Sequence, residues 1–232
     1  MSRIYIFDAV HTVLKPVPDV IRCYYEAGKQ HGSSLTRPEV KRRFRDARSR
    51  LFALSHSAAE TAAGSLVSSD QIEFKLWQSL IGEVFVDVAK IEPLFQQLWE
   101  YFASPQSWQL YDDVASSWQS LADRGERLAI ASNFDSRLHE IVKLHSVFSL
   151  AEAVFCSAEV GFRKPDPMFY QQVADRLSLG PQEEVIMVGD DFENDYEAPR
   201  LFGWQAFHLD RRHGTEPDRI GKGTISSLSQ LL

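Results

Sequence analysis

Polar side chains that could take part in catalysis follow four short apolar runs of this chain. They are a carboxylate at Asp8, a hydroxyl and an amide at Ser132 and Asn133, an ammonium at Lys164, and acids at Asp190, Asp191 and Asp195. Each group alone has an ordinary structural explanation, such as a helix cap or a turn. Because all four occur in this order, each after an apolar run, we interpret them as parts of one site.

These residue types suit phosphoryl transfer through a covalent intermediate. A carboxylate such as Asp8 can attack phosphorus and divide one difficult hydrolysis into two easier steps. Because the attack brings two anions together it needs a divalent cation, and Mg²⁺ prefers oxygen ligands from one or two carboxylates. We therefore expect Mg²⁺ between Asp8, the backbone carbonyl of Val10 and Asp190. Ser132 and Lys164 would bind the remaining phosphoryl oxygens.

The elements that must position these groups are short strands that alternate with helices. Apolar runs at 4–7, 128–131, 153–155, 185–188 and 205–208 are predicted strands, and the stretches 113–123, 136–147, 167–177 and 193–202 are amphipathic. This alternation is typical of an α/β fold with a doubly wound parallel sheet covered on both faces. Ligands of such sheets bind at the carboxyl ends of the strands, so the polar groups would meet at one edge.

A long, almost wholly helical region separates the first predicted strand from the second. Helices are predicted over 19–30, 36–54 and 90–102, and another starts at 69–70 with Ile72, Leu76, Leu80 and Ile81 on its buried side. The Ser- and Ala-rich stretch 55–69 is predicted to be a loop. The pattern therefore predicts a core domain of residues 1–13 and 108–232, interrupted by a helical-bundle cap domain at 14–107.

Composition narrows the class of protein. The chain has 232 residues, 44% of them hydrophobic and 25% charged, which fits one α/β domain with an insert. Its net charge of −7 argues against a nucleic-acid partner. No apolar run approaches the roughly 20 residues of a membrane span. Cys23 and Cys156 are far apart in sequence and form no CxxC or metal-binding motif, so we interpret them as reduced thiols. We expect a cytoplasmic protein without a membrane partner, and the sequence gives no indication of oligomeric state.

The four motifs together resemble those of the haloacid dehalogenase-like (HAD) hydrolase superfamily. They read I-F-D-A-V-H-T ending at Thr12, A-S-N ending at Asn133, K-P-D-P starting at Lys164, and V-G-D-D-F-E-N-D ending at Asp195. The resemblance covers the whole chain, because that superfamily carries a helical cap between its first and second motifs.

The resemblance implies a role for each matching residue. Asp8 would be the nucleophile and a metal ligand, and Asp190 a second metal ligand. Ser132 and Lys164 would bind phosphate, with Thr12 and Asn133 completing the substrate-binding group. Asp195 would support the metal's water shell or the lysine, and Asp191 is a further supporting residue.

Position 10 departs from the superfamily's phosphatases, which normally have a second aspartate there. That residue protonates the leaving alkoxide and later deprotonates the attacking water, and its loss costs on the order of 10²–10⁴ in rate. This chain has Val10 instead, followed by His11 where a glycine is usual. Val10 still has a carbonyl for the metal, and His11 is a candidate supporting group.

Three functions are consistent with this pattern. The first is Mg²⁺-dependent phosphatase chemistry on a small phosphorylated metabolite, slow or limited to good leaving groups. The second is that of a 2-haloacid dehalogenase, whose halide leaving group needs no proton. The third is a phosphate-binding or regulatory protein without turnover. Dehalogenases replace the Gly-Asp of the fourth motif with Ser and Asn and bind no metal, so the retained Gly189-Asp190-Asp191 favours the first.

Overall fold

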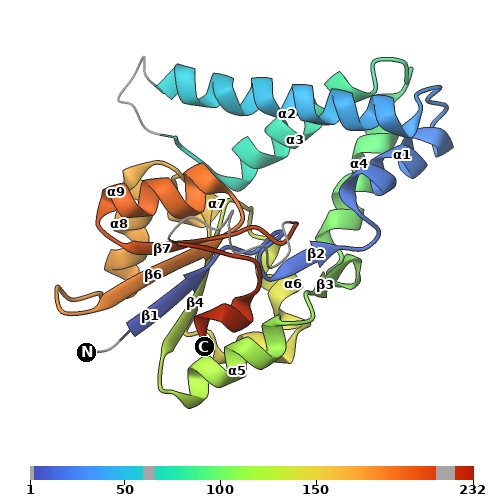
Figure 1. The fold of residues 1–232 in the computed structure, drawn as a ribbon. Coiled ribbons are helices and arrows are strands. Elements are labelled where there is room, and N and C mark those ends of the chain that lie inside the picture. The colour runs from blue at the N-terminus through green and yellow to red at the C-terminus, as the bar shows by residue number, and fades with distance from the viewer. Residues whose placement is uncertain (1–2, 60–65, 213–222) are drawn as a thin grey trace.

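Six parallel strands form the central sheet of the computed structural model, which describes residues 3–59, 66–212 and 223–232, with side chains omitted for 52–59. Their order is β5-β4-β1-β6-β7-β8, and Figure 1 labels the four central strands β4, β1, β6 and β7. The bounds are β1 Arg3–Phe7, β4 Arg127–Ser132, β5 Ala153–Cys156, β6 Glu184–Gly189, β7 Gln205–Leu209 and β8 Thr224–Ile225. The central strand β1 pairs in parallel with both β4 and β6, so Phe7 lies opposite Ile130 and Val188.

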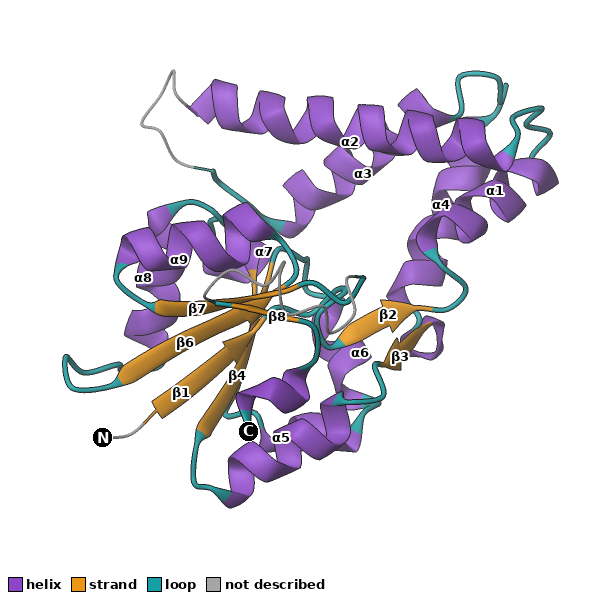
Figure 2. Ribbon diagram, in the orientation of Figure 1, coloured by secondary structure: helices purple, strands orange, loops and turns teal. Residues whose placement is uncertain are grey.

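Helices cover both faces of this sheet, as Figure 2 shows. They are α5 Val114–Asp123 and α6 Leu138–Lys143 on one face, and α8 Pro167–Arg176 and α9 Ala198–Phe202 on the other. Alternate residues of β1 face opposite sides. Phe7 packs against Trp118 of α5, with ring centroids 5.0 Å apart, whereas Ile4 and Ile6 share an apolar cluster with Phe169 of α8. The predicted doubly wound parallel sheet is confirmed.

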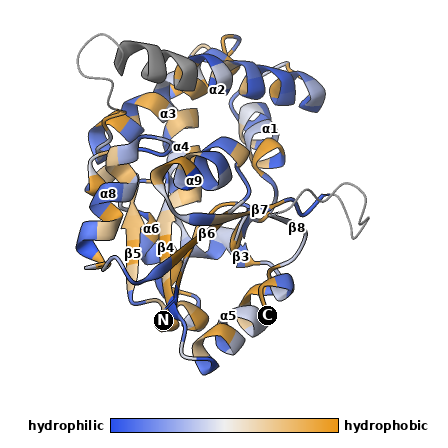
Figure 3. Cartoon of the chain, turned by 60° about the vertical axis from the view of Figure 1, so that its left-hand side comes forward, coloured by the Kyte–Doolittle hydropathy of each residue, from blue (hydrophilic) through white to orange (hydrophobic). Residues whose placement is uncertain are grey.

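Four helices between β1 and β4 build a second apolar cluster of their own. They are α1 Val20–Gln30, α2 Arg37–Ala59, α3 Asp70–Val84 and α4 Ile91–Ala103. Tyr24, Leu80, Phe85 and Phe95 are buried between them. Figure 1 shows these helices grouped on the side of the sheet away from the N-terminus. Figure 3 shows α2 as largely hydrophilic, in contrast to the apolar strands β4 and β5. A short antiparallel pair, β2 Leu14–Pro16 and β3 Trp108–Leu110, connects them to the sheet.

Two predictions for these helices were wrong. Helix α2 continues to Ala59, so 55–59 is not a loop, in keeping with the high helix propensity of alanine; residues 60–65 lie outside the described part of the chain. On α3, Ile72 is 41% exposed whereas Glu73 is 1% exposed. Leu80 and Ile81 are buried as predicted. The first turn of α3 therefore buries Glu73, because the guanidinium of Arg163, itself a buried residue, lies next to its carboxylate.

Several connections are more irregular than periodicity predicted. The stretch 136–147 divides into α6 and a 3₁₀-helix at Ser146–Leu150, and the stretch 193–202 starts as a π-helical turn at Phe192–Glu197 before α9. Further short helices lie at Pro105–Ser107, α7 Ser157–Val160 and Leu228–Leu231. Cys23 and Cys156 are buried free thiols. Across the described residues, no helix has the length and apolar character needed to cross a membrane.

Candidate active site

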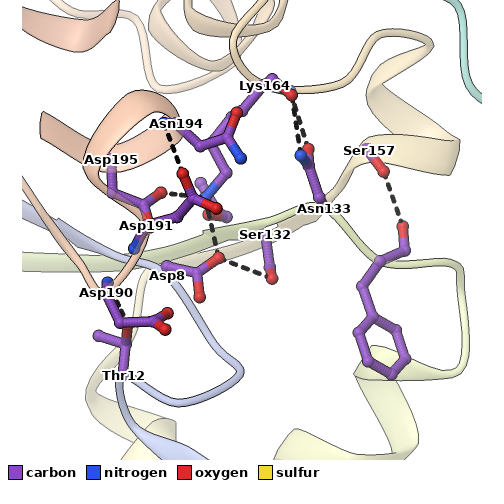
Figure 4. Close-up of polar contacts among 12 residues, drawn as sticks. Asp8, Thr12, Ser132, Asn133, Ser157, Lys164, Asp190, Asp191, Asn194 and Asp195 are labelled. Atoms are coloured by element: carbon purple, nitrogen blue, oxygen red, sulfur yellow. Dashed lines mark hydrogen bonds and ion pairs between the residues drawn. The ribbon is translucent and has the colours of Figure 1, made fainter. Parts of the chain in front are cut away.

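Asp8 lies directly beyond β1, at the carboxyl edge of the sheet, where two neighbouring groups contact it. Its Oδ1 accepts hydrogen bonds from Ser132 Oγ at 2.9 Å and Lys164 Nζ at 2.8 Å (Figure 4). Ser132 ends β4, which pairs with β1, so strand pairing itself brings hydroxyl and carboxylate together. Asp8 is 7% exposed and Ser132 2% exposed. The predicted convergence of these three side chains is present.

Lys164 joins two acids in the floor of the site. Its ammonium also contacts Asp195 Oδ1 at 2.5 Å and the Ala131 carbonyl at 3.1 Å, and the residue is 3% exposed. Burial alone would lower the pKa of Lys164, but the charges of Asp195 and Asp8 outweigh it and raise this pKa above its usual value. The lysine is therefore a permanent cation next to the candidate nucleophile.

Asn133 holds the backbone of Lys164 in this structure. Its Oδ1 accepts from the Lys164 N–H at 2.8 Å, and its Nδ2 donates to the Lys164 carbonyl at 2.9 Å. This two-sided amide contact fixes the peptide from which the ammonium extends. Asn133 therefore positions the lysine, and its assignment to substrate binding stays a prediction.

Asp190 follows β6 and is held from the first motif. The Thr12 hydroxyl accepts from the Asp190 N–H at 3.1 Å and lies 3.5 Å from Asp190 Oδ1. Thr12 is fully buried, and its hydroxyl contacts Asp190 in this structure. Asp191 Oδ1 accepts from the Asn194 N–H at 3.1 Å, which caps the turn that carries Asp195.

Gly189 is required by a close approach between β6 and Asp195. A Cβ at position 189 would lie 2.2 Å from Asp195 Oδ2. We expect Gly189→Ala to displace Asp195 from Lys164 and to lower the free energy of unfolding by about 1–3 kcal/mol. Urea denaturation would measure this, with Gly82→Ala as control, because a Cβ there meets nothing within 4 Å. Equal stability of Gly189→Ala and wild type would contradict the packing argument.

Three carboxylates at this edge fit a divalent cation. Oxygens of Asp8, Asp190 and Asp195 lie within 4.8 Å of one another. Octahedral Mg²⁺, with ligands at about 2.1 Å, separates neighbouring oxygens by about 3 Å and opposite ones by about 4.2 Å. Burial, followed by the charge of Asp8, raises the pKa of Asp190 to about 8. The protein thus concentrates more negative charge here than Lys164 balances, and Asp8 and Asp190 are suited to hold a cation.

Val10 and His11 lie in the loop that follows Asp8. Val10 is half-buried, pairs with Leu14 in an isolated bridge and packs against the apolar cluster under α5. His11 has φ of 65°, in the left-handed region that favours glycine, which explains why glycine is usual at this position. His11 is an exposed residue, yet surrounding protein lowers the pKa of His11 against the opposing effect of nearby Asp8.

Arg211 is a supporting residue that the sequence analysis missed. It follows β7, donates to the Thr12 carbonyl at 2.8 Å and pairs with Asp113 at 3.0 Å. Its guanidinium also lies 4.1 Å from the centroid of the Tyr111 ring. The same rule that found Asp190, inspection of residues just past each predicted strand, would have found Arg211 beyond 205–208.

The parallel sheet and the carboxylate–lysine site at its edge define a class of hydrolase. A sequence model of the haloacid dehalogenase-like hydrolase family matches residues 3–203. Because this match covers most of the chain, the protein belongs to the HAD-like hydrolases.

Comparisons with individual proteins agree with this membership. Haloacid dehalogenase-like hydrolase domain-containing protein 3 of Homo sapiens is 28% identical over 99% of this chain and 92% of its own length. A phosphoserine phosphatase of Thermus thermophilus is 32% identical over 51% of this chain and 47% of its own. The crystal structure of L-2-haloacid dehalogenase from Xanthobacter autotrophicus has the same fold, with a TM-score of 0.72 at 16% identity over 100% of this chain and 97% of that one. The relatives thus include both phosphatases and haloacid dehalogenases.

Proposed function

We propose that this protein is a Mg²⁺-dependent phosphatase that works through an aspartyl-phosphate on Asp8, with poor activity toward substrates that have an alkoxide leaving group. The observation that carries the proposal is the contact of one Asp8 oxygen with both Ser132 and Lys164, next to an intact Gly189-Asp190. A small phosphorylated metabolite in the cytoplasm is the substrate that this proposal implies, with no nucleic-acid or membrane partner.

The residues of the site divide the reaction into two steps. Both hydrogen bonds to Asp8 go to Oδ1, so Oδ2 is the oxygen that would attack phosphorus. The bond from phosphorus to the leaving oxygen then breaks, while Ser132 and Lys164 stabilise charge on the phosphoryl oxygens. Attack of water on the same phosphorus would release inorganic phosphate and restore Asp8. Bound between Asp8, the Val10 carbonyl and Asp190, Mg²⁺ would neutralise phosphoryl charge.

Val10 determines which leaving groups are suitable. An alkoxide needs a proton as it departs, and a valine side chain has none to give. Acyl and aryl phosphates have leaving groups that are stable without one, so we propose them as the better substrates. A halide is stable in the same way, and for this reason the related dehalogenases make 2-haloacid hydrolysis the alternative. A phosphate-binding protein without turnover is the other alternative.

One substrate panel separates these functions. Acetyl phosphate, an aryl phosphate and an alkyl phosphate would be assayed with and without Mg²⁺, beside 2-chloropropionate. The proposal expects Mg²⁺-dependent release of phosphate in the order acyl, aryl, alkyl. Chloride release without metal would establish the dehalogenase alternative. Phosphate binding with no turnover of any substrate would establish the non-catalytic one.

Metal binding gives a separate prediction. Wild type should bind one Mg²⁺ in calorimetry, and Asp190→Asn should weaken this binding by at least about tenfold, since it removes one of the two charged ligands. Asp123→Asn is the matched control, because Asp123 is an exposed carboxylate at the end of α5, where it accepts from Gln119. Equal Mg²⁺ affinity of wild type and Asp190→Asn would exclude the proposed site.

We further propose that residues 14–107 are a cap domain over a core of 1–13 and 108–232. The separate apolar cluster of α1–α4 and the β2–β3 pair at the junction support this division. A cap would exclude water from Asp8 and select the substrate.

A further inference from the structure

Glu73 is a buried acid on α3 whose carboxylate faces the loop that carries Lys164. Its Oε1 lies 3.4 Å from Arg163 Nη1 and accepts from Ser68 Oγ at 2.7 Å. Glu73 is 1% exposed and Arg163, the residue before Lys164, is 6% exposed. Burial lowers the pKa of Arg163, and the charge of Glu73 opposes this effect. An ion pair therefore spans the space between the inserted helices and the lysine loop.

Backbone contacts align the same two segments. The Ser68 N–H donates to the Gly161 carbonyl at 2.9 Å, and the Arg163 N–H donates to the Leu66 carbonyl at 2.8 Å. Val67 and Phe162 form an antiparallel bridge between these contacts. Residues 66–68, which precede α3, thus lie antiparallel to residues 161–163 and are hydrogen-bonded to them.

Side chains extend this contact on both sides. Asp166, two residues after Lys164, accepts from the Leu66 N–H through Oδ2 at 2.5 Å. At the start of α3, Asp70 Oδ1 accepts from the Ser136 N–H at 2.8 Å, just beyond the second motif. The start of α3 is therefore attached to the loops that carry both candidate phosphate-binding side chains, Ser132 and Lys164.

A buried ion pair is a poor source of stability, because removal of both charges from water offsets much of their attraction. A better-supported role of a buried ion pair is to favour one conformation of the protein over other packed conformations. We propose that Glu73 and Arg163 are positioning residues that couple the placement of α3 to that of the Lys164 ammonium, so that the position of the helical insert sets the affinity of the site for phosphate. This inference rests on the proposed role of Lys164 in phosphate binding.

Hydrogen exchange of the full-length chain tests the coupling without any need for turnover. Glu73→Gln removes the charge but keeps an oxygen for Ser68. The amides of Arg163, Lys164 and Asp166 are all hydrogen-bonded in the structure, and in this variant we expect them to exchange at least about tenfold faster. The matched control is Glu83→Gln, on the same helix as Glu73, which breaks a surface ion pair with Arg50 of α2. It should leave these amides unchanged.

Affinity for inorganic phosphate in the presence of Mg²⁺ is the second measurement. We expect Glu73→Gln to weaken it by about 3- to 30-fold, the range typical of coupling through a packed network, and Glu83→Gln to leave it unchanged. If Glu73→Gln does not fold, the double variant Glu73→Gln/Arg163→Met, which leaves no unpaired buried charge, takes its place in both measurements.

The two measurements separate the coupling from the proposed function. Faster exchange confined to 66–68 and 161–166, with weaker phosphate binding, supports the proposal. Unchanged exchange there, or exchange accelerated equally in β4 and β6, overturns it. If wild type binds no phosphate, the proposed function fails, and a local change of exchange still establishes that α3 positions the lysine loop.

Discussion

Val10→Asp is expected to raise kcat/KM for an alkyl phosphate by roughly 10–10³. The new carboxyl would lie two residues from Asp8, at the position from which the superfamily's phosphatases protonate the leaving oxygen. The gain stays below the full effect of a general acid because the neighbouring groups are not arranged to tune its pKa. An aryl phosphate should gain less in its first step, since its leaving group is already stable. Steady-state kinetics with both substrate types measures this difference.

Val10→Asn is the matched control for this experiment. It has nearly the shape of the aspartate but no ionisable proton to transfer, so its alkyl phosphatase activity should stay at the level of wild type. Both variants lose the packing of Val10 against the apolar cluster under α5, at about 1 kcal/mol of unfolding free energy. If wild type already hydrolyses alkyl and aryl phosphates equally well, another group carries the proton. His11, the residue after Val10, would then be the first candidate for that group.

The sheet could be predicted from the sequence, and so could the strand ends that carry the site residues, because both follow from local patterns. Continuous apolar strands indicate a buried parallel sheet, and a parallel sheet brings all its carboxyl ends to one edge. Ser132 and Lys164 therefore met Asp8 as expected, although they lie 124 and 156 residues from it in sequence.

Side-chain partners could not be predicted in the same way, since they depend on distances between loops. The assignment of Thr12 and Asn133 to substrate binding stays a prediction, and in the structure their polar atoms contact Asp190 and the Lys164 backbone. The sequence placed both residues at the edge of the sheet that carries the site, but it gave no indication of their hydrogen-bond partners.

Periodicity also failed where a polar network replaces apolar packing. The pattern placed Ile72 on the buried side of α3, and the structure buries Glu73 there against Arg163. Hydrophobic spacing cannot detect a helix turn that faces a buried cation. Such local failures of pattern are expected at functional or constrained positions, and this one led to the proposed coupling between α3 and Lys164.

Asp8→Asn is expected to lower kcat by a factor on the order of 10⁴ or more on every phosphate substrate, as loss of a nucleophile does in other covalent enzymes. An amide oxygen can still accept from Ser132 and Lys164, so the site should keep its shape. An amide is not a competent nucleophile toward phosphorus, however, and no acyl phosphate can form. Asp8→Asn should abolish activity in the Val10→Asp background as well, because a general acid cannot replace the nucleophile.

Two measurements make this prediction specific to Asp8. Acid quenching of wild type during turnover of acetyl phosphate should trap an alkali-labile phosphoenzyme, and Asp8→Asn should trap none. Thermal unfolding should show that the variant is folded, since it removes one of three clustered negative charges and leaves Lys164 paired with Asp195. Asp46→Asn, an exposed change on α2 that breaks the ion pair with Arg45, is the control for handling and purity. If Asp8→Asn retains activity within tenfold of wild type, the attack comes from water or another side chain. Asp8 would then be a metal ligand alone, and the two-step reaction through an aspartyl-phosphate would be excluded.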